Sequence, residues 1–557
     1  TNKEDSIVPA NVIKIDSADN LWSVTGNGVG RFENGEFKIL LENSLDKTRY
    51  LSAITADKQK QVWFGYYESV YKLGENGVLD KYDISDLTKG GIRSMMFDRE
   101  DNLWIGTNGD GLIRLSPRKI KTLSTADGLP SDEIMTIIED PGGYGVWIGG
   151  VGLTHWQNGK ATVYTKENGL PANRIYSLRF AKEGTLWIGT LGGLASMKNG
   201  QISLYPESAN VPSWVKTIFE DSRGNIWIGY QGNGLQLYQN GQFRNFTNEN
   251  GLINDSVNFI TEDREGRLWI GTASGISIAK IVCPNAGQSC NTPESLEFTN
   301  FTTQNGLSNN FVRDIYEDED DTFWIGTYGG GLNRLRNGKF TVVTIKDGLG
   351  DDFISRILPD EHGNFWLLGN RGIFSVSRQN LNDFADGKTQ GLVCGSYGVA
   401  DGMLSSEGNG GNTPAGWKMQ DGTLWFPMIK GVSIINPKII KPQSLPVLIE
   451  GVTLDREELN PQSKIVVNPG QENLEIHYTG LSFSKPEQIR FRYKLENLDT
   501  NWTEAGTRRV AYFPHLPPGT YRFTVIAANS DAVWSESAAT LEITVLSPIW
   551  MRWWFIV

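Results

Sequence analysis

Apolar and polar residues alternate in short runs that recur along the first four-fifths of the chain. In one stretch the runs cover residues 175–180, 186–190, 194–198 and 201–205. The first alternates as a half-buried strand does, and turn residues bound each of the others. Asn199-Gly200 joins the last two runs, and both residues tolerate the positive φ of a type I′ hairpin turn. The pattern predicts a meander of four antiparallel strands.

A tryptophan marks the second run of each repeat, in strings such as Leu-Trp-Ile-Gly-Thr. The ten anchors are Trp22, Trp63, Trp104, Trp147, Trp187, Trp227, Trp269, Trp324, Trp366 and Trp425, with spacings of 41, 41, 43, 40, 40, 42, 55, 42 and 59 residues. Four strands in a period of about 40 to 45 residues are typical of β-propeller blades. We therefore predict an all-β fold with about ten blades over residues 1–440. Most anchors have Gly two residues later, which leaves room for a neighbouring blade.

Ten blades exceed the usual four to eight of one propeller. The last seven anchors, Trp147 to Trp425, fit one seven-bladed ring, with a boundary near residue 125. Trp22, Trp63 and Trp104 then belong to part of another ring. A fourth strand is not evident in the last blade, and the residues before the first blade make a poor closing strand. Either ten blades close imperfectly, or the chain is a fragment of a longer array, which we favour.

A second domain is predicted over residues 441–546, after a linker stiffened by nearby prolines. Strands are expected at 447–454, 472–478, 489–495, 521–529 and 539–545. Their lengths and spacing indicate an immunoglobulin-like β-sandwich without its Cys pair. Residues 547–557 combine aromatic residues with an apolar run, as at a membrane interface. We expect them to start a truncated transmembrane segment; the alternative is a hydrophobic final strand.

The net charge and the cysteines limit the binding partners and the covalent chemistry expected of this chain. The net charge of −12 argues against binding to nucleic acid or to anionic membranes by the soluble part. Cys283 and Cys290 flank a short insertion and fit either a local disulfide or two free thiols. Cys394 is expected to be a small buried residue rather than a nucleophile.

No catalytic constellation is evident. The four histidines lie in different repeats or domains, without metal-ligand spacing. The acidic run 317–321 suggests either a calcium site or, more simply, a solvated turn between two strands. We therefore predict no catalytic residues, no metal and no cofactor, and no enzyme activity for this chain.

The repeats resemble a known family. The Leu-Trp-Ile-Gly-Thr-x-x-Gly-Leu strings, with the loops 127–130 and 168–171 before them, are similar to the two-component-regulator propeller repeat. Residues 447–546 resemble the Tyr-rich sandwich module, the Y_Y_Y domain, through 491–495, 501–502 and 516–523. The family usually has two seven-bladed propellers, this sandwich, a transmembrane helix and a cytoplasmic output domain. This chain departs from it with ten anchors and no output domain.

The resemblance implies the ligand-sensing region of a signal-transduction receptor, a sensor histidine kinase or hybrid two-component system. Such a region lies on the periplasmic, extracytoplasmic face of a bacterial inner membrane, anchored by a single pass in the full-length protein. Relatives sense oligosaccharides, so a small ligand is expected, and the full-length protein could be a histidine kinase. We also expect a homodimer through the sandwich. The alternatives are a secreted propeller enzyme acting on polysaccharide, which needs a pair of carboxylates, and a scaffold for protein partners.

A ligand site is predicted on the face formed by the loops between strands two and three and between blades. The candidate residues on this rim are Tyr66, Tyr67, Asn108, Tyr230, Gln231, Tyr328, Asn370 and Arg371. Aromatic faces and planar polar groups suit an oligosaccharide. The simpler interpretation is a solvated rim with scattered tyrosines.

Overall fold

The computed structural model describes residues 10–15, 20–25, 28–33, 36–42, 51–74, 79–205, 214–282, 295–440, 444–461 and 464–548. These residues build antiparallel sheets, with one short α-helix, α1 (Arg378–Ala385), in the long interval after Trp366. The fold is all-β, with propeller blades followed by a sandwich, as the sequence predicts. The chain divides into two compact units: Thr1–Pro117 with Ser482–Pro486, and Arg118–Leu481 with Glu487–Val557.

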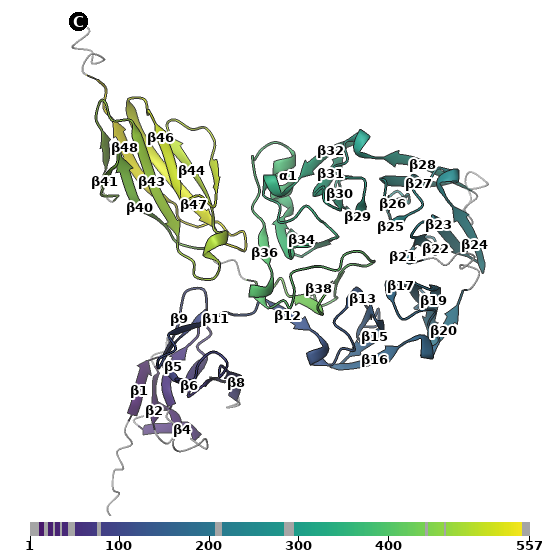
Figure 1. Ribbon diagram of the computed structural model, residues 1–557, viewed down its shortest axis with the longest axis horizontal. Helices are drawn as coiled ribbons and strands as arrows, with labels where there is room; N and C mark the ends of the chain where they lie inside the picture. The colour runs from purple at the N-terminus through teal and green to yellow at the C-terminus, as the bar shows by residue number, and fades with distance from the viewer. Residues whose placement is uncertain are drawn as a thin grey trace, which may run out of the picture. The chain divides into compact units, whose positions relative to one another are not determined.

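Seven four-stranded sheets form a ring of blades in the second unit (Figure 1). Six blades use consecutive strands, and the first strand of each lies innermost. Their bounds are β13 (Ile134–Glu139), β14 (Val146–Gly150), β15 (Gly152–Gln157), β16 (Lys160–Tyr164); β17 (Ile175–Phe180), β18 (Leu186–Thr190), β19 (Gly193–Lys198), β20 (Gln201–Leu204); β21 (Val215–Glu220), β22 (Ile226–Tyr230), β23 (Leu235–Gln239), β24 (Gln242–Phe246); β25 (Val257–Glu262), β26 (Leu268–Thr272), β27 (Ile276–Val282), β28 (Ser295–Phe301); β29 (Val312–Glu317), β30 (Phe323–Thr327), β31 (Leu332–Arg336), β32 (Lys339–Val343); and β33 (Arg356–Pro359), β34 (Asn364–Leu368), β35 (Ile373–Ser377), β36 (Gly395–Tyr397).

The seventh blade closes the ring with a strand from the other end of the unit. It contains β37 (Trp417–Lys418), β38 (Leu424–Pro427) and β39 (Val432–Ile435), and its outer strand is β12 (Ile120–Leu123). β12 runs antiparallel to β39, with Ile120 opposite Ile435. The fourth strand that the sequence did not reveal in the last blade therefore precedes the first blade of the ring.

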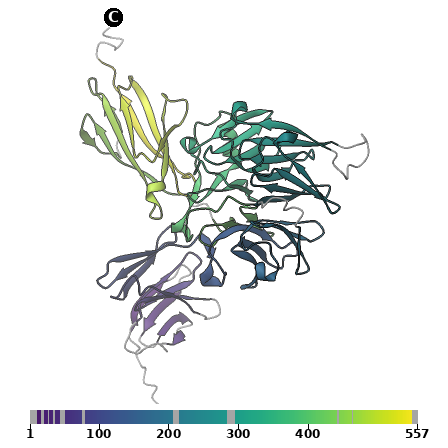
Figure 2. The same ribbon diagram turned by 45° about the vertical axis from the view of Figure 1, so that its right-hand side comes forward.

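Glycines allow neighbouring blades to pack closely. A Cβ added at Gly229, two residues after Trp227, would lie 2.6 Å from Val257 Cγ1 at the start of the next inner strand. The same relation joins Gly189 to Val215 and Gly271 to Val312. The missing side chain thus makes room for a bulky residue of the following blade. Seen obliquely in Figure 2, the ring is a series of such stacked sheets.

Local turns match the sequence signals. At Asn199-Gly200 both residues have positive φ, 51° and 78°, as a type I′ turn requires. Most blades of the ring are preceded by a one-turn 3-10 helix that a capping box begins and a left-handed Gly ends. These helices are η1 (Thr125–Asp127), η2 (Lys166–Asn168), η4 (Asn248–Asn250), η5 (Thr303–Asn305), η6 (Ile345–Asp347) and η7 (Val399–Asp401).

The first unit contains three further sheets. Two have four strands: β1 (Ala10–Ile15), β2 (Leu21–Thr25), β3 (Gly28–Glu33), β4 (Glu36–Glu42); and β5 (Leu51–Ala56), β6 (Val62–Tyr66), β7 (Ser69–Leu73), β8 (Leu79–Asp83). The third has three: β9 (Ile92–Phe97), β10 (Leu103–Thr107) and β11 (Leu112–Leu115). The strand that follows β11 in the chain is β12, which belongs to the ring.

The C-terminal sandwich packs two sheets around an aromatic core. One sheet has the order β41 (Glu457–Leu459), β40 (Val447–Leu454), β43 (Asn473–Gly480), β46 (Val510–Pro514). The other has the order β42 (Ile465–Val467), β48 (Ala539–Val545), β47 (Gly519–Ala528), β44 (Arg490–Glu496), β45 (Thr503–Gly506), and the 3-10 helix η8 (Pro486–Gln488) precedes β44. Tyr478, Tyr493 and Phe523 meet in the core, with ring centroids 5.6–6.2 Å apart. The strands missed by the sequence, β41, β42, β45 and β46, are mostly short edge strands.

Several sequence predictions fall on residues outside those described. They include Cys283, Cys290 and residues 549–557 of the expected membrane segment. Among the described residues, no helix is both long and apolar enough to cross a membrane. Cys394 is described as a free cysteine, and burial raises the pKa of its thiol to about 12.

Candidate functional site

A hydrogen bond inside most blades of the ring fixes the anchor tryptophan. Trp227 Nε1 donates to Asp221 Oδ2 at 2.9 Å, and Asp221 lies in the turn between the first two strands. The same bond joins Trp269 to Asp263, and Trp324 to Asp318. Asp318 belongs to the acidic run considered as a calcium site, but its carboxylate is buried and also accepts from Arg378. These carboxylates therefore have a structural role.

A β-bulge occurs at the second residue of five inner strands. The register of β21 against β22 shifts between Val215 and Thr217, and equivalent shifts occur in β13, β17, β25 and β29. A bulge leaves its extra residue unpaired and re-aims the side chain. The five bulged residues are Met135, Tyr176, Lys216, Asn258 and Arg313. They share one end of the inner strands, and unlike the anchors they differ from blade to blade.

Lys216 is a buried cation at this end. Its Nζ lies 4.1 Å from the centroid of the Trp214 ring and donates to Gly411 O at 2.8 Å. The residue is 5% exposed. Burial, and then the charge of Arg313, lower the pKa of Lys216 from 10.5 to about 7. Within the described part of the chain, Lys216 has no carboxylate in ion-pair contact.

Arg313 is the second cation of this end of the ring. Its guanidinium carbon lies 4.6 Å from the centroid of the Phe311 ring and 5.1 Å from that of Tyr328. Burial lowers its pKa, and its Nε is buried without a hydrogen-bond partner. As with Lys216, no acidic side chain of the described residues pairs with it.

A loop from the last blade crosses the same end of the channel. Thr413 forms a parallel bridge with Ser177, and its Oγ1 donates to Lys216 O at 2.8 Å. Farther along, Ile137 N donates to Pro414 O, and Asn409 Nδ2 donates to Ile134 O. The loop 408–416 therefore contacts several blades, and it places Gly411 directly above Lys216.

Below this loop the channel wall holds a buried ion pair. Arg356 Nη1 lies 3.2 Å from Asp314 Oδ1, and Ile357 N donates to Asp314 Oδ2. Burial raises the pKa of Asp314 despite the neighbouring guanidinium. The pair borders a cavity of about 260 Å³, which is also lined by Arg179 and Trp417. The Asp314–Arg356 pair is matched in charge, whereas Arg179 on the same cavity has its Nε buried without a hydrogen-bond partner.

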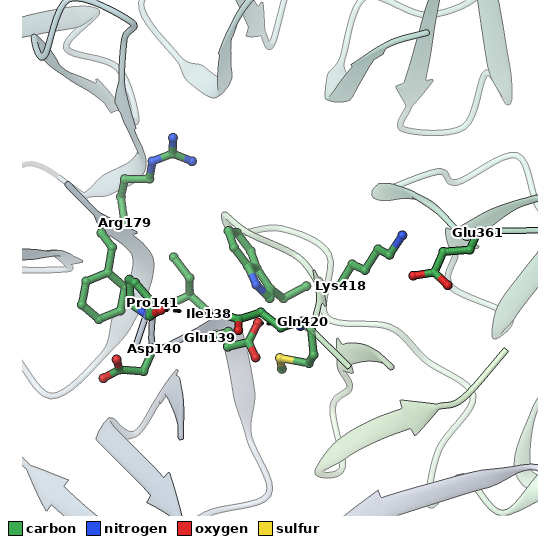
Figure 3. A pocket seen from close by; sticks show the side chains of 11 residues that line it. Ile138, Glu139, Asp140, Pro141, Arg179, Glu361, Lys418 and Gln420 are labelled. Carbon is green, nitrogen blue, oxygen red and sulfur yellow. Dashed lines mark hydrogen bonds between the residues drawn. The ribbon is translucent and has the colours of Figure 1, made fainter. Parts of the chain in front are cut away.

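A larger pocket of about 530 Å³ opens at the opposite end of the inner strands (Figure 3). Figure 3 shows Glu361 and Lys418 pointing toward one another, with Arg179 on the other side. Glu139 accepts from Gln420 N at 2.9 Å, and burial raises its pKa. Asp140 follows Glu139 but accepts from anchor Trp147, so these two neighbouring carboxylates do not form a convergent pair.

The predicted rim residues fall into two groups. Tyr66 and Tyr230 are 7% and 2% exposed and belong to the core, so the prediction that these two rings contact a ligand is corrected. Tyr230 OH donates to Gln236. The other rim residues are exposed or half-buried: Tyr67, Asn108, Gln231, Tyr328, Asn370 and Arg371. Of these, Tyr328 contacts Arg313 and therefore adjoins the bulged residues.

Sequence reasoning missed Lys216, Arg313 and Asn258. A signal was present, because each lies eleven residues before its anchor, Trp227, Trp324 or Trp269. The repeat predicts an inner strand there, but strand alternation does not reveal a bulge or the direction of its side chain.

The blades and the sandwich match two family models. Residues 86–109, 169–192, 211–232, 251–274 and 306–329 match the two component regulator propeller, and residues 482–546 match the Y_Y_Y domain. The chain therefore contains two-component-regulator propeller repeats and a Y_Y_Y domain. Its repeats lie in both compact units, since 86–109 belongs to the first.

Two solved structures have similar chains. The extracellular domain of a putative hybrid two component system from B. thetaiotaomicron is 24% identical, with a TM-score of 0.67 over 97% of this chain and 73% of that one. A second such domain from the same organism is 18% identical, with a TM-score of 0.46 over 98% and 75%. The first likeness shows that this chain shares its fold with that domain.

A curated relative is similar in sequence. Histidine kinase P4 of Formosa agariphila is 23% identical over 510 residues, which cover 83% of this chain and 32% of that protein. The chain thus spans about a third of the length of this curated relative.

Proposed function

We propose that this chain is the extracytoplasmic ligand-sensing region of a membrane-bound receptor, a sensor histidine kinase or hybrid two-component system. The observation that carries the proposal is the order of its parts, propeller repeats and then a Y_Y_Y domain. The likeness to a histidine kinase over most of this chain supports it. The chain itself binds and transmits, and the phosphoryl-transfer chemistry belongs to an output domain on the cytoplasmic side.

The ligand of the proposal is an oligosaccharide or another small molecule bound at the rim of the ring. Tyr328 supplies an exposed aromatic face, and Gln231 and Arg371 supply exposed planar polar groups. Calorimetry against a panel of oligosaccharides tests this, with Tyr328→Ala and Arg371→Ala as variants. Unchanged affinity in both variants would remove this face as the site.

The sandwich is the proposed route of the signal. In the second unit, Lys119 Nζ lies 2.6 Å from Asp531 Oδ2, and Ser396 N donates to Ser530 O. Lys119 directly precedes the ring-closing strand β12, so these bonds connect the sandwich to the closure of the ring. Receptors of this kind can signal by a shift between two-fold related subunits.

We therefore propose a homodimer in which the sandwich contributes to the contact. The test is disulfide crosslinking of single Cys substitutions along residues 493–502 in the full-length receptor, with and without ligand. A ligand must favour one dimer arrangement, typically by about 1–3 kcal/mol. Crosslinking that is absent, or identical in both conditions at every position, would exclude this route.

A further inference from the structure

The bulge end of the ring has positive charge without a matching negative charge. Lys216 and Arg313 come from non-adjacent blades, and their charges are close enough for Arg313 to disfavour protonation of Lys216. Other guanidinium groups of the ring have a carboxylate partner, as Arg356 has Asp314 and Arg334 has Asp386, although Arg179 also has a buried Nε without a hydrogen-bond partner. A buried charge without a partner costs the folded state free energy. Such groups are therefore concentrated at functional sites.

Unsatisfied polar atoms surround the two cations. Buried atoms without a hydrogen-bond partner include Trp214 Nε1, Arg313 Nε, Asn258 Oδ1 and Asn412 Oδ1. Asn258 Nδ2 donates to Val312 O beside Arg313, and Asn412 follows Gly411, whose carbonyl receives Lys216. Two of these four atoms, Trp214 Nε1 and Arg313 Nε, are N–H donors without a partner, and an anion with several oxygens can accept from both.

The aromatic surroundings suit a sugar ring that carries such an anion. Tyr328 is 46% exposed and packs edge-on against Phe353, with centroids 4.6 Å apart. Its ring lies over the Arg313 guanidinium, so a group bound at Arg313 extends along the exposed tyrosine. An aromatic face beside a guanidinium group fits a pyranose with an anionic substituent better than it fits a free inorganic ion.

We propose that Arg313 and Lys216, with Trp214 and Tyr328, form the subsite for an anionic group of the sensed oligosaccharide. The group is a carboxylate or a sulfate on a sugar ring. Arg313 contacts the anion, Tyr328 contacts the sugar face, and Lys216 supplies charge from beneath Gly411. This inference rests on the proposed function, because it specifies the chemistry of the ligand that the sensor recognises.

The test compares three tetrasaccharides by calorimetry on this chain. One carries galacturonate carboxylates, one is its carboxyl-reduced neutral counterpart, and one carries sulfate on galactose. We expect an acidic tetrasaccharide to bind at least tenfold more tightly than the neutral one. Comparing the two acidic tetrasaccharides then shows whether the anion is a carboxylate or a sulfate. Arg313→Met and Lys216→Met should weaken that binding about ten- to a hundredfold, since hydrogen bonds to charged groups contribute about 1.5–3 kcal/mol. The control Lys198→Met removes an exposed charge at the end of β19 and should change affinity less than twofold.

Proton uptake provides a second readout. An anion bound beside Lys216 favours its charged form, so binding near pH 8 should take up protons, measured as a buffer-dependent enthalpy. Three groups face Lys216. They are Arg313 of β29, Trp214 directly before β21, and Gly411 of the loop 408–416. Proton uptake on binding should be absent in Lys216→Met. If Lys216 has a purely structural role, the variant and the parent chain should take up the same number of protons.

The outcomes separate the inference from the function on which it rests. Equal binding of neutral and acidic tetrasaccharides, or binding that both Met variants leave unchanged, overturns the anionic subsite while the oligosaccharide sensor stands. If no tetrasaccharide binds, the oligosaccharide ligand is wrong, and inorganic sulfate then tests the subsite alone. Sulfate should raise the melting temperature of the parent chain more than that of Arg313→Met, and equal shifts overturn the subsite.

Discussion

Two positions of the ring repeat in geometry but differ in chemistry. The anchor position carries Trp in all seven blades, and in most of them its indole donates to a carboxylate of the same blade. The bulge position has the same backbone in five blades but carries Met, Tyr, Lys, Asn and Arg. The first position packs blades together, and the second places a different side chain at the same end of each of these inner strands. A repeat fold can therefore vary the side chain at one position while the other preserves the architecture.

The largest effect should come from removing an anchor. Trp269 is 2% exposed, stacks on Phe323 of the next blade at 4.0 Å, and donates to Asp263. We expect Trp269→Ala to lower the free energy of unfolding by about 3–5 kcal/mol. Urea unfolding measures this, with Leu204→Ala on an exposed outer strand as the control, which should change it by under about 0.5 kcal/mol. Equal losses in the two variants would contradict a special role of the anchor.

Replacing the buried lysine at the bulge position should instead raise the free energy of unfolding. The pKa of Lys216 is about 7 in the folded chain and 10.5 for an unperturbed lysine, so the unfolded state binds more protons between these values. The penalty from Lys216 is full below pH 7 and is relieved as pH rises toward 10.5. Lys216→Met should therefore be more stable than the parent chain below pH 7, with an advantage that shrinks above it and a ceiling of about 5 kcal/mol.

The difference between the two unfolding curves measures this effect, because other titrating groups cancel in it. A variant that is less stable than the parent at pH 6, or a difference that does not change from pH 6 to 10, would show that Lys216 stabilises the ring. The same experiment with Lys198→Met, where the charge is exposed, should give no pH-dependent difference.

The next largest change in stability should come from adding a methyl group where two blades are in close contact. A Cβ at Gly229 would lie 2.5 Å from Thr217 Cγ2 and 2.6 Å from Val257 Cγ1. We expect Gly229→Ala to cost about 1–3 kcal/mol, because the blades must separate to admit the methyl group. Gly398 is the matched control, since its φ is −152° and no atom lies within 4 Å of an added Cβ. Similar urea midpoints for Gly229→Ala and Gly398→Ala would exclude tight blade packing at Gly229.

The anchor position could be predicted from sequence, and the bulge position could not. Trp and Gly repeat at fixed spacing, so periodicity alone locates the strands and predicts which residues pack between blades. Lys216 instead lies in a run that reads as an ordinary strand. Its surroundings come from Arg313, ninety-seven residues later, and from Gly411 in an irregular loop. Tyr230 illustrates the converse error: its place after an anchor suggested the rim, but a hydrogen bond to Gln236 holds its ring inside the blade.

The closing strand escaped prediction for a related reason. β12 has four residues, and its sequence Ile-Lys-Thr-Leu alternates like the outer strand of any blade. Nothing local indicates that it pairs with Val432–Ile435 rather than with β11, which precedes it. That choice depends on the geometry of a complete ring, which only long-range pairing defines.

In two blades of the ring the anchor has no carboxylate partner: Trp425 donates to Thr423 Oγ1, and Trp187, which gives the last prediction, has no partner. Trp187 Nε1 is buried without a partner, and Ala181 occupies the position that Asp221 holds in the next blade. The two turns have the same backbone bonds, from Ala181 N to Thr185 O and from Asp221 N to Asn225 O. We expect Ala181→Asp to raise the free energy of unfolding by about 0.5–1.5 kcal/mol, the usual net contribution of one hydrogen bond. In a Trp187→Phe background, which has no N–H to donate, the same substitution should give no gain, because it then buries a carboxylate without the indole partner. A gain of equal size in both backgrounds, measured by urea unfolding, would show that the turn rather than the Trp–Asp bond is what Asp stabilises.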